Sequence, residues 1–320
     1  MVKEVLSDIY RIEIPLPRNP LRAINAYVIR GGDRCLMVDT GMNRPECIEA
    51  VRASLRVLDV DLDRTDFFIT HAHSDHIGLV SELKAPPSKV FLNAAEAAII
   101  LDPNLWADMV AAARVHGFPE PDAAIEKHPG RKYLFRGRPE FTFLGEGDTL
   151  SVGRYGFRCV ETPGHTPGHM CLYDPEAKIL FSGDHILDTI TPNISGWDSG
   201  ADPLGEFLRS LDKIASYEIR LILPAHRDPI SDPLRRIGEL KAHHRARMDE
   251  VLGILGRGAR TAYQVASQMS WKIDRARWED FPLPQKWFAT GEALSHLLHL
   301  EQTGRIRRRL HEGRAVFYVE

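Results

Sequence analysis

The segment THAHSDH, Thr70–His76, is the feature that most restricts what this chain can fold into. It follows the apolar run DFFIT and precedes a stretch typical of a helix, so it lies where a strand ends. Alternate residues of an extended segment point the same way, and His71 and His73 can therefore converge on one metal ion. Asp75 and His76 lie where the chain turns and can face a second ion. This mixture of imidazole and carboxylate suits zinc first, with Mn2+ or Fe2+ as alternatives.

Three further segments each place one ligand-type residue at the end of a predicted strand. His165 lies in PGHTPGH, whose glycines permit a tight backbone, while Asp184 lies in FSGDH and His226 in LPAH. Any one of these residues, taken alone, is typical of an ordinary surface or core position. Together with the first segment they provide seven ligands for two ions, with the Asp184 carboxylate as the natural bridge.

Short apolar runs alternate with helical stretches along the first 230 residues, which predicts a layered α/β domain. We expect strands at residues 9–15, 24–30, 35–40, 66–70, 140–145, 155–162, 170–174, 178–184 and 220–226, and helices at 44–58 and 203–216. A helical and basic segment at about residues 93–137 breaks this rhythm, and we interpret it as an insertion over one face. Side chains at strand ends are fixed by a rigid sheet and remain accessible.

The C-terminal part has a different pattern. A basic helix over residues 231–254 leads to residues 255–320, which read as helix, Trp/Pro-rich loop, helix and hairpin. That order predicts a small winged-helix domain beside a principal domain of residues 1–230, a division in keeping with a chain of 320 residues. The helix expected at residues 290–304 contains no lysine or arginine, so duplex DNA is not an expected ligand.

The motifs HxHxDH, GHTPGH, a GD after a strand, and PAH together resemble the metallo-β-lactamase superfamily, with a core like that of glyoxalase II. The resemblance covers roughly residues 8–230 and implies a four-layered αββα sandwich with the site at one edge of its two sheets. It implies that one zinc is bound by His71, His73 and His165 and the other by Asp75, His76 and His226, with Asp184 bridging. It also implies that Asp75 and Asp184 take part in catalysis.

The expected chemistry follows from the two metals. Two cations about 3.5 to 4 Å apart can hold a hydroxide between them and polarise a substrate oxygen, so no serine or cysteine nucleophile is needed. Zinc lowers the pKa of bound water to about 7. By the resemblance, Asp75 orients the hydroxide and later passes a proton to the leaving group. Asp39 in VDTG and His169 are expected to orient the ligands by hydrogen bonds, although an aspartate such as Asp39 is also typical of a turn.

Composition sets few further limits. The 41 basic and 44 acidic residues, with a net charge of -3 and 43% hydrophobic residues, are typical of a globular protein and favour neither nucleic acid nor a membrane as partner. The first residues contain no apolar run as long as a signal peptide or a spanning helix, so we expect a cytoplasmic location. The four scattered cysteines predict neither a disulfide framework nor a cysteine-zinc site.

We therefore expect a dinuclear zinc-dependent hydrolase that cleaves a small ester, thioester or lactone, with its substrate-binding residues unassigned and a homo-oligomer as one option. A metal-dependent endoribonuclease of the same fold is the first alternative, and it requires a basic channel. The basic residues available for one include Arg131, Lys132, Arg136, Arg138, Arg305, Arg307, Arg308 and Arg309. A mononuclear iron oxidoreductase resembling persulfide dioxygenases is the second alternative, which the presence of both His76 and His226 disfavours.

Overall fold

The computed structural model describes residues 1–135, 137, 140–197, 202–272 and 277–320. Arg136 and Arg138, two of the basic residues considered above, lie outside the described residues. The chain forms two compact units, each built from three stretches of sequence. The first unit comprises Met1–Leu101, Tyr133–Pro192 and Ser210–Ile237, and the second comprises Asp102–Lys132, Asn193–Arg209 and Gly238–Glu320. Most of the predicted insertion thus belongs to the second unit.

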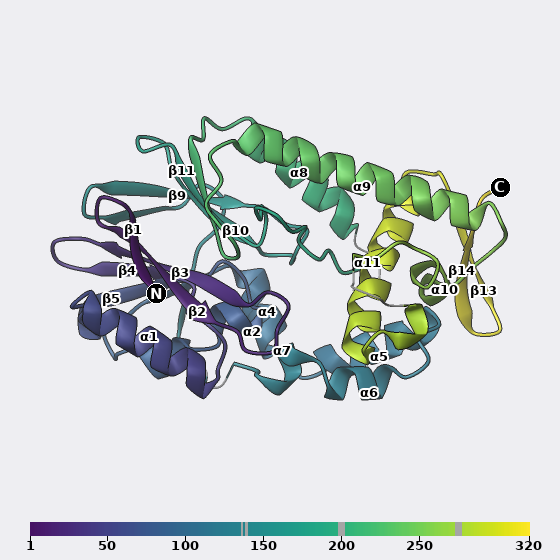
Figure 1. Ribbon diagram of the computed structural model, residues 1–320, viewed down its shortest axis with the longest axis horizontal. Helices are drawn as coiled ribbons and strands as arrows, with labels where there is room; N and C mark the ends of the chain where they lie inside the picture. Colours follow the sequence, from purple (N-terminus) through teal and green to yellow (C-terminus); the bar gives the residue numbers. More distant parts are fainter. Residues whose placement is uncertain (136, 138–139, 198–201, 273–276) are drawn as a thin grey trace. The chain divides into compact units, whose positions relative to one another are not determined.

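The first unit contains a sheet of seven strands that lie in sequence order (Figure 1). They are β1 (Val2–Leu6), β2 (Ile9–Pro15), β3 (Ala23–Arg30), β4 (Cys35–Val38), β5 (Thr65–Phe68), β6 (Val90–Leu92) and β7 (Phe141–Phe143). β1 to β4 pair antiparallel, whereas β4 to β7 pair parallel. Because parallel neighbours run the same way, the carboxyl ends of β4 and β5 meet at one edge of the sheet.

A second sheet of the same unit has the order β12-β11-β10-β9-β8. Its strands are β8 (Thr149–Val152), β9 (Tyr155–Glu161), β10 (Met170–Asp174), β11 (Ile179–Gly183) and β12 (Leu221–Pro224). β8 to β11 pair antiparallel, and β11 and β12 pair parallel. β9, β11 and β12 therefore all end at the same edge of this sheet.

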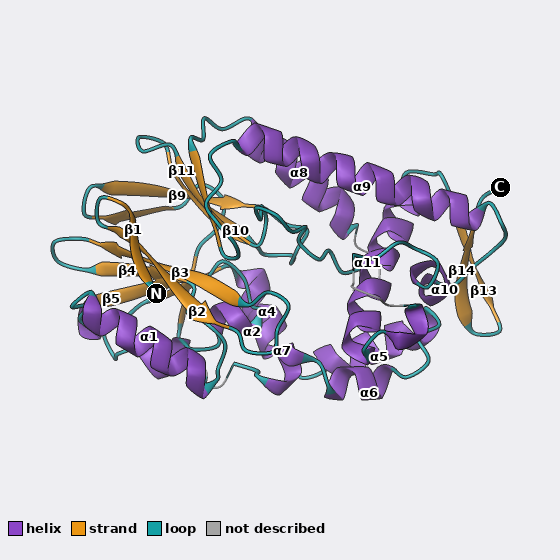
Figure 2. Cartoon of the chain, viewed as in Figure 1, coloured by secondary structure: helices purple, strands orange, loops and turns teal. Residues whose placement is uncertain are grey.

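The two sheets pack face to face over an apolar core. Its members that are at most 2% exposed include Ile29, Val38 and Phe68 from the first sheet and Phe157, Leu172 and Phe181 from the second. The amphipathic helix α1 (Pro45–Val57) buries Cys47, Val51 and Leu55 on the outer face of the first sheet. On the outer face of the second sheet, the ring of Tyr173 packs against Tyr217, which follows α8 (Pro203–Ala215). This helix–sheet–sheet–helix order is the sandwich that the motifs implied (Figure 2).

All the strands expected from the sequence are present, with ends that differ by a few residues. β1, β6 and β8 are not expected from the sequence, because VKEVL, VFL and TLSV are short or interrupted by charged and small polar residues. The remaining helices of the first unit are η1 (Leu62–Arg64), α2 (Ser74–Ile77), α3 (Val80–Leu83) and α4 (Ala94–Leu101). Of these, α2 directly follows the histidine-rich loop.

The second unit is mainly helical, with one hairpin. Besides the start of α8, it contains α5 (Leu105–Val115), α6 (Pro121–Glu126), α7 (Pro129–Lys132), most of α9 (Pro233–Leu255), α10 (Ala262–Ala266), η2 (Trp278–Asp280), α11 (Leu283–Gln302), β13 (Arg307–His311) and β14 (Arg314–Tyr318). Its core includes Phe118, Trp287 and Phe317. The winged-helix assignment of residues 255–320 stays a prediction. Among the helices of the described residues, none combines the length and apolar character that crossing a bilayer requires.

Candidate metal centre

The residues expected to bind metal all lie beyond the carboxyl ends of strands in the first unit. They are His71 and His73 in the loop after β5, Asp75 and His76 in α2, His165 after β9, Asp184 after β11, and His226 after β12. The structure brings all seven together in three overlapping groups, within each of which the ligand atoms lie within 4.8 Å of one another. The groups are His71, His73 and His165; His71, His76 and Asp184; and Asp75, His76 and His226.

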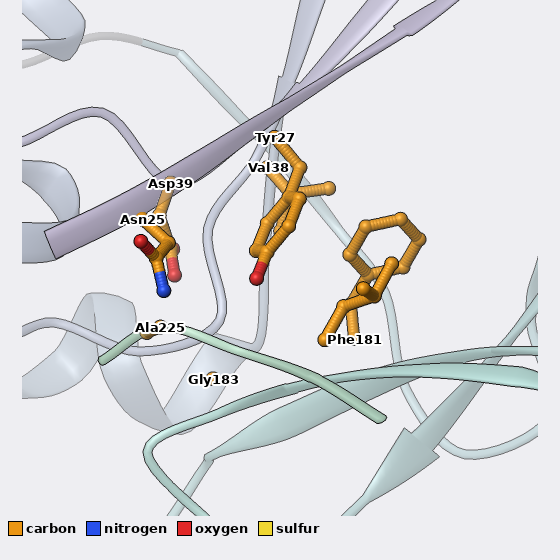
Figure 3. Close-up of a pocket in the computed structure, with 8 residues that line it drawn as sticks. Asn25, Tyr27, Val38, Asp39, Phe181, Gly183 and Ala225 are labelled. Atoms are coloured by element: carbon orange, nitrogen blue, oxygen red, sulfur yellow. The ribbon is translucent and has the colours of Figure 1, made fainter. Parts of the chain in front are cut away.

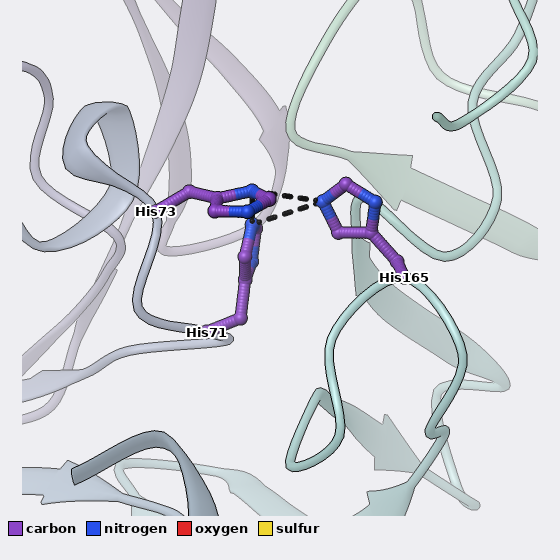
Figure 4. A group of neighbouring side chains, drawn as sticks. All are labelled: His71, His73 and His165. Carbon is purple, nitrogen blue, oxygen red and sulfur yellow. Dashed lines mark hydrogen bonds between the residues drawn. The ribbon is translucent and has the colours of Figure 1, made fainter. Parts of the chain in front are cut away.

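Three imidazoles form one side of this cluster (Figure 4). His71 Nε2 lies 2.9 Å from His73 Nδ1, and His165 Nε2 lies 3.2 Å from the former and 3.0 Å from the latter. Ligands placed tetrahedrally at 2.0 to 2.1 Å from a zinc ion are separated from one another by about 3.3 Å. The three histidine nitrogens are therefore spaced nearly as a single tetrahedral ion requires.

Asp184 connects this trio to the second side of the cluster. Its Oδ2 lies 3.6 Å from His165 Nε2, and its Oδ1 lies 3.6 Å from His76 Nε2 and 3.4 Å from His226 Nε2. Asp75 Oδ2 lies 3.6 Å from the same His226 nitrogen. His76 Nε2, Asp184 Oδ1 and His226 Nε2 are buried and have no hydrogen-bond partner among the described residues. Because unpartnered buried polar atoms are unfavourable, their convergence indicates a place for a cation.

Hydrogen bonds on the far side of two rings orient them toward the cluster. The Nδ1 of His226 donates to the carbonyl oxygen of Ala23 at 2.7 Å. The Nδ1 of His76 lies 2.8 Å from Asp39 Oδ2. In a neutral imidazole, a protonated Nδ1 leaves the lone pair on Nε2, and it is Nε2 that faces the carboxylates here. Both rings thus present the nitrogen that a metal would bind.

Asp39, which follows β4, has a turn conformation and hydrogen-bonds next to the expected ligands. Its φ of 56° lies in the left-handed region found in turns. Its carboxylate accepts hydrogen bonds from the backbone N of Thr70 at 2.9 Å and from the Thr70 hydroxyl at 2.9 Å, in addition to the contact with His76. The Thr70 hydroxyl oxygen in turn lies 3.1 Å from His71 Nδ1. Asp39 thereby reaches two expected ligands, while its effect on metal binding stays a prediction.

His169 supports the backbone of Asp184. Its Nδ1 lies 2.7 Å from the Thr162 hydroxyl, and its Nε2 accepts a hydrogen bond from the backbone N of Asp184 at 3.2 Å. His169 thus touches the expected bridging residue through the main chain. The adjacent His185 is fully buried and belongs to none of the three groups of candidate ligands.

Burial and neighbouring charges shift the pKa values of three residues in the cluster. Burial, with the neighbouring histidines, holds the pKa of His71 well below its usual value, so the ring is neutral and suited to binding a cation. Burial also acts to lower the pKa of His76, but the Asp39 and Asp184 carboxylates outweigh it and raise that pKa well above its usual value. Burial acts to raise the pKa of Asp184, yet His226 and His76 hold it well below its usual range. Asp184 therefore keeps its negative charge.

Two residues of β3, neither expected from the sequence, hold the segment that contains His226. The side-chain amide of Asn25 donates to the carbonyl oxygens of Pro224 at 3.0 Å and Arg227 at 2.7 Å, and the Tyr27 hydroxyl donates to Pro224 at 2.8 Å. Figure 3 shows both side chains directed from β3 toward the segment with Ala225. In the sequence, the one sign of this role was the amide residue Asn25 within the largely apolar run INAYVIR.

The donor set suits cations of zinc's chemical type. The donors are five imidazoles and two carboxylates. Zinc readily accepts this combination of imidazole nitrogen and carboxylate oxygen. The donors come from the edge where the strand ends of both sheets meet, which gives them rigid support. Fold and site together define a metal-dependent enzyme with its centre at the edge of an αββα sandwich.

Comparisons with known proteins agree with this class. The sequence profile of the metallo-beta-lactamase superfamily matches residues 19–226. A metallo-beta-lactamase family protein from Thermus thermophilus, known from a crystal structure, superposes with a TM-score of 0.84 at 29% identity, over 99% of this chain and 100% of that chain. The atrochrysone carboxyl ACP thioesterase of Emericella nidulans is 28% identical over 243 residues, 76% of this chain and 64% of that protein. The probable metallo-hydrolase YqjP of Bacillus subtilis is 24% identical over 277 residues, 82% of this chain and 85% of that protein.

The chain belongs to the metallo-beta-lactamase superfamily, because the profile matches more than half of its length. The matched residues include all seven expected ligands, from His71 to His226. The match confirms the family resemblance that was inferred from the motifs. The protein is accordingly a metal-dependent hydrolase.

Proposed function

We propose that the chain binds two zinc ions and hydrolyses a small thioester. One ion would be held by His71, His73 and His165, and the other by Asp75, His76 and His226, with Asp184 touching both. The observation that supports this most is the position of Asp184, whose oxygens face different groups of histidines. Its Oδ2 lies 3.6 Å from His165 Nε2 and its Oδ1 lies 3.4 Å from His226 Nε2.

Bound ions would lower the pKa of water to about 7 and polarise the substrate carbonyl. The protein's own contribution is orientation and proton transfer. Asp75 lies in α2 with its carboxylate 3.6 Å from His226 Nε2, and its side chain is 12% exposed. In this proposal Asp75 accepts a proton from the attacking water and delivers it to the leaving group. Asp39 and the Ala23 carbonyl meanwhile keep the His76 and His226 rings in place.

A thioester is the preferred substrate among esters, thioesters and lactones. Thiols have a pKa of about 8.5, so a thiolate leaves near neutral pH with little help from an acid, whereas an alkoxide needs protonation. Of the three substrate classes, a thioester therefore depends least on proton delivery to the leaving group. The Emericella nidulans relative, whose name states that it is a thioesterase, is in line with this choice.

The first test is metal content. Full-length protein should contain about two zinc ions per chain, because two sets of donors share one carboxylate. Elemental analysis of the purified protein and zinc titration of chelator-treated protein measure this. His226→Ala, which removes a donor from one set only, should retain about one tightly bound ion. A content near one in the unchanged protein, with iron dominant, would contradict the two-zinc proposal and support the iron oxidoreductase.

The second test is substrate preference. A thioester and an oxygen ester with the same acyl group differ only in the leaving atom, so their comparison isolates it. The thioester should be hydrolysed with a kcat/KM at least about tenfold higher, a difference of about 1.4 kcal/mol in activation free energy. A lactone and a single-stranded RNA complete the panel. Equal rates for the ester pair would remove the thioester preference, and faster cleavage of RNA would support the endoribonuclease instead.

A further inference from the structure

Glu96 is a buried carboxylate that belongs to none of the three groups of candidate ligands. It lies in α4, in the run AAEAAIIL, and its exposed fraction is 0%. Burying an ionised carboxylate is strongly unfavourable unless hydrogen bonds or opposite charges compensate for the lost water. An acidic residue at this position therefore needs hydrogen-bond donors or opposite charges that offset the cost of its burial.

The carboxylate of Glu96 accepts hydrogen bonds from two backbone N–H groups that belong to different loops. Its Oε2 accepts a hydrogen bond from the N of Ala72 at 2.7 Å, and its Oε1 accepts one from the N of Gly168 at 2.7 Å. Ala72 stands between His71 and His73, and Gly168 precedes His169 in the loop that contains His165. Hydrogen bonds of this length to an ionised acceptor are among the stronger ones in proteins.

We propose that Glu96 is a positioning residue that ties these two loops together and so sets the spacing of His71, His73 and His165. The inference rests on the proposed function, because those three histidines are its expected zinc ligands. The three ring nitrogens lie 2.9 to 3.2 Å apart although they come from loops nearly a hundred residues apart in sequence. Glu96 is a direct polar connection between those loops that does not pass through the ligands.

The residues around Glu96 allow the backbone at Gly168 to come close to the Glu96 carboxylate. Asn93, just before α4, accepts a hydrogen bond from the N of Ala95 at 2.9 Å and donates to Glu161 at the end of β9 at 2.9 Å, which anchors the helix beside the second loop. A Cβ on Gly168 would lie 3.0 Å from the Cγ of Glu96 and 2.8 Å from the Asn93 side-chain oxygen. The absence of a side chain at Gly168 therefore lets its N–H reach the carboxylate.

Glutamate suits this role better than its closest substitutes. Glutamine keeps the length but offers one acceptor oxygen, so one N–H group would face an NH2 group that is itself a donor. Aspartate keeps the charge but is one methylene shorter, so it would lose reach to one of the loops. Either change should loosen the arrangement without removing a ligand.

The experiment measures zinc affinity and folding separately in full-length protein. Zinc is titrated into chelator-treated protein in competition with a chromophoric chelator, and thermal melting of the metal-free protein is recorded. In the His226→Ala background, where one ion is expected to remain with His71, His73 and His165, adding Glu96→Gln should weaken zinc binding about 10- to 100-fold, the usual effect of losing a group that orients ligands. Glu96→Asp, which keeps the charge, provides a second variant if Glu96→Gln fails to fold.

Two controls separate positioning from general destabilisation. Asp174 is a buried carboxylate that accepts the backbone N–H groups of Gly156, Glu176 and Ala177, but it lies at the other end of β10 from the site. Asp174→Asn should lower the melting temperature of the metal-free protein and leave zinc affinity unchanged. Asn25→Ala, added to the same His226→Ala background, should also leave the remaining ion unaffected, because Asn25 holds only the His226 segment.

The outcomes distinguish the inference from the function on which it rests. If unchanged protein binds no zinc, the proposed function fails. If the wild-type protein binds two ions, and the Glu96 variants bind zinc as tightly as the His226→Ala protein into which they are introduced, Glu96 is not a positioning residue. The inference is also overturned if Asp174→Asn weakens zinc binding as much as Glu96→Gln does, because loss of any buried carboxylate would then suffice.

Discussion

Asp184→Ala is expected to lower kcat/KM for the best thioester by at least about a thousandfold, or about 4 kcal/mol of transition-state stabilisation. Asp184 lies within 3.6 Å of histidine nitrogens on both sides of the cluster, so its loss takes a donor from both proposed ions. The spacing between the ions would no longer be held by a bridge. Steady-state kinetics of the variant and the unchanged protein, both with zinc in excess, measure the effect.

The same substitution should leave the metal-free fold largely intact. The backbone of Asp184 is held by His169, and β11 and β12 are joined by their own backbone pairing, so neither contact needs the carboxylate. Melting of the chelator-treated proteins tests this. Asp174→Asn should behave in the opposite way, with reduced stability and retained activity. If Asp184→Ala unfolds while the metal-free unchanged protein stays folded, Asp184 is chiefly structural and its catalytic assignment is wrong.

The grouping of the seven candidate ligands follows from the sequence because each one sits beyond the end of an apolar strand. Strand ends are readable from local pattern, and strands that run the same way end at the same edge. His71 and His73 are also two residues apart in an extended segment, which puts their rings on one side. The convergence seen in the structure is therefore largely a consequence of local features repeated in four segments.

The contacts that support the ligands could not be predicted in the same way. Glu96 meets Ala72 and Gly168 from 24 and 72 residues away, and Asn25 meets Pro224 from 199 residues away. Such partners depend on how α4 and β3 pack against loops that are distant in sequence. The hydrophobic periodicity of a segment carries no information about that packing. A polar residue inside an apolar run was the one visible sign in both cases, and it does not name its partner.

The limits of the fold prediction have a similar origin. β2 and β10 are long and apolar enough to be recognised, whereas β6 has three residues and forms because β5 and β7 flank it. The grouping of α5 and α6 with the C-terminal helices is also non-local. Their side chains Val110 and Ile125 share a core with Trp287 and Leu297, and that contact is visible only in three dimensions.

Gly183→Ala is expected to have the largest effect on stability, because this residue stands directly before Asp184 in a confined position. Its φ of 49° is left-handed, a conformation that costs a residue with a Cβ about 1 to 2 kcal/mol. A Cβ there would lie 2.6 Å from His169 Nε2 and 2.8 Å from the Cβ of Thr70, and such overpacking adds about 1 to 3 kcal/mol. We expect the free energy of unfolding of the metal-free protein to fall by about 2 to 5 kcal/mol.

Gly156→Ala is the matched control for this prediction. Gly156 lies in β9 of the same sheet and has no positive φ, and a Cβ at this position would meet no other part of the described chain within 4 Å. Urea unfolding of chelator-treated protein should show a change below about 1 kcal/mol for Gly156→Ala. Gly183→Ala should also weaken zinc binding, because His169 and Thr70, the residues it would displace, contact Asp184 and His71. Equal stability of the two variants would mean that the strand end before Asp184 can move aside, and that the centre tolerates a shift of its bridging residue.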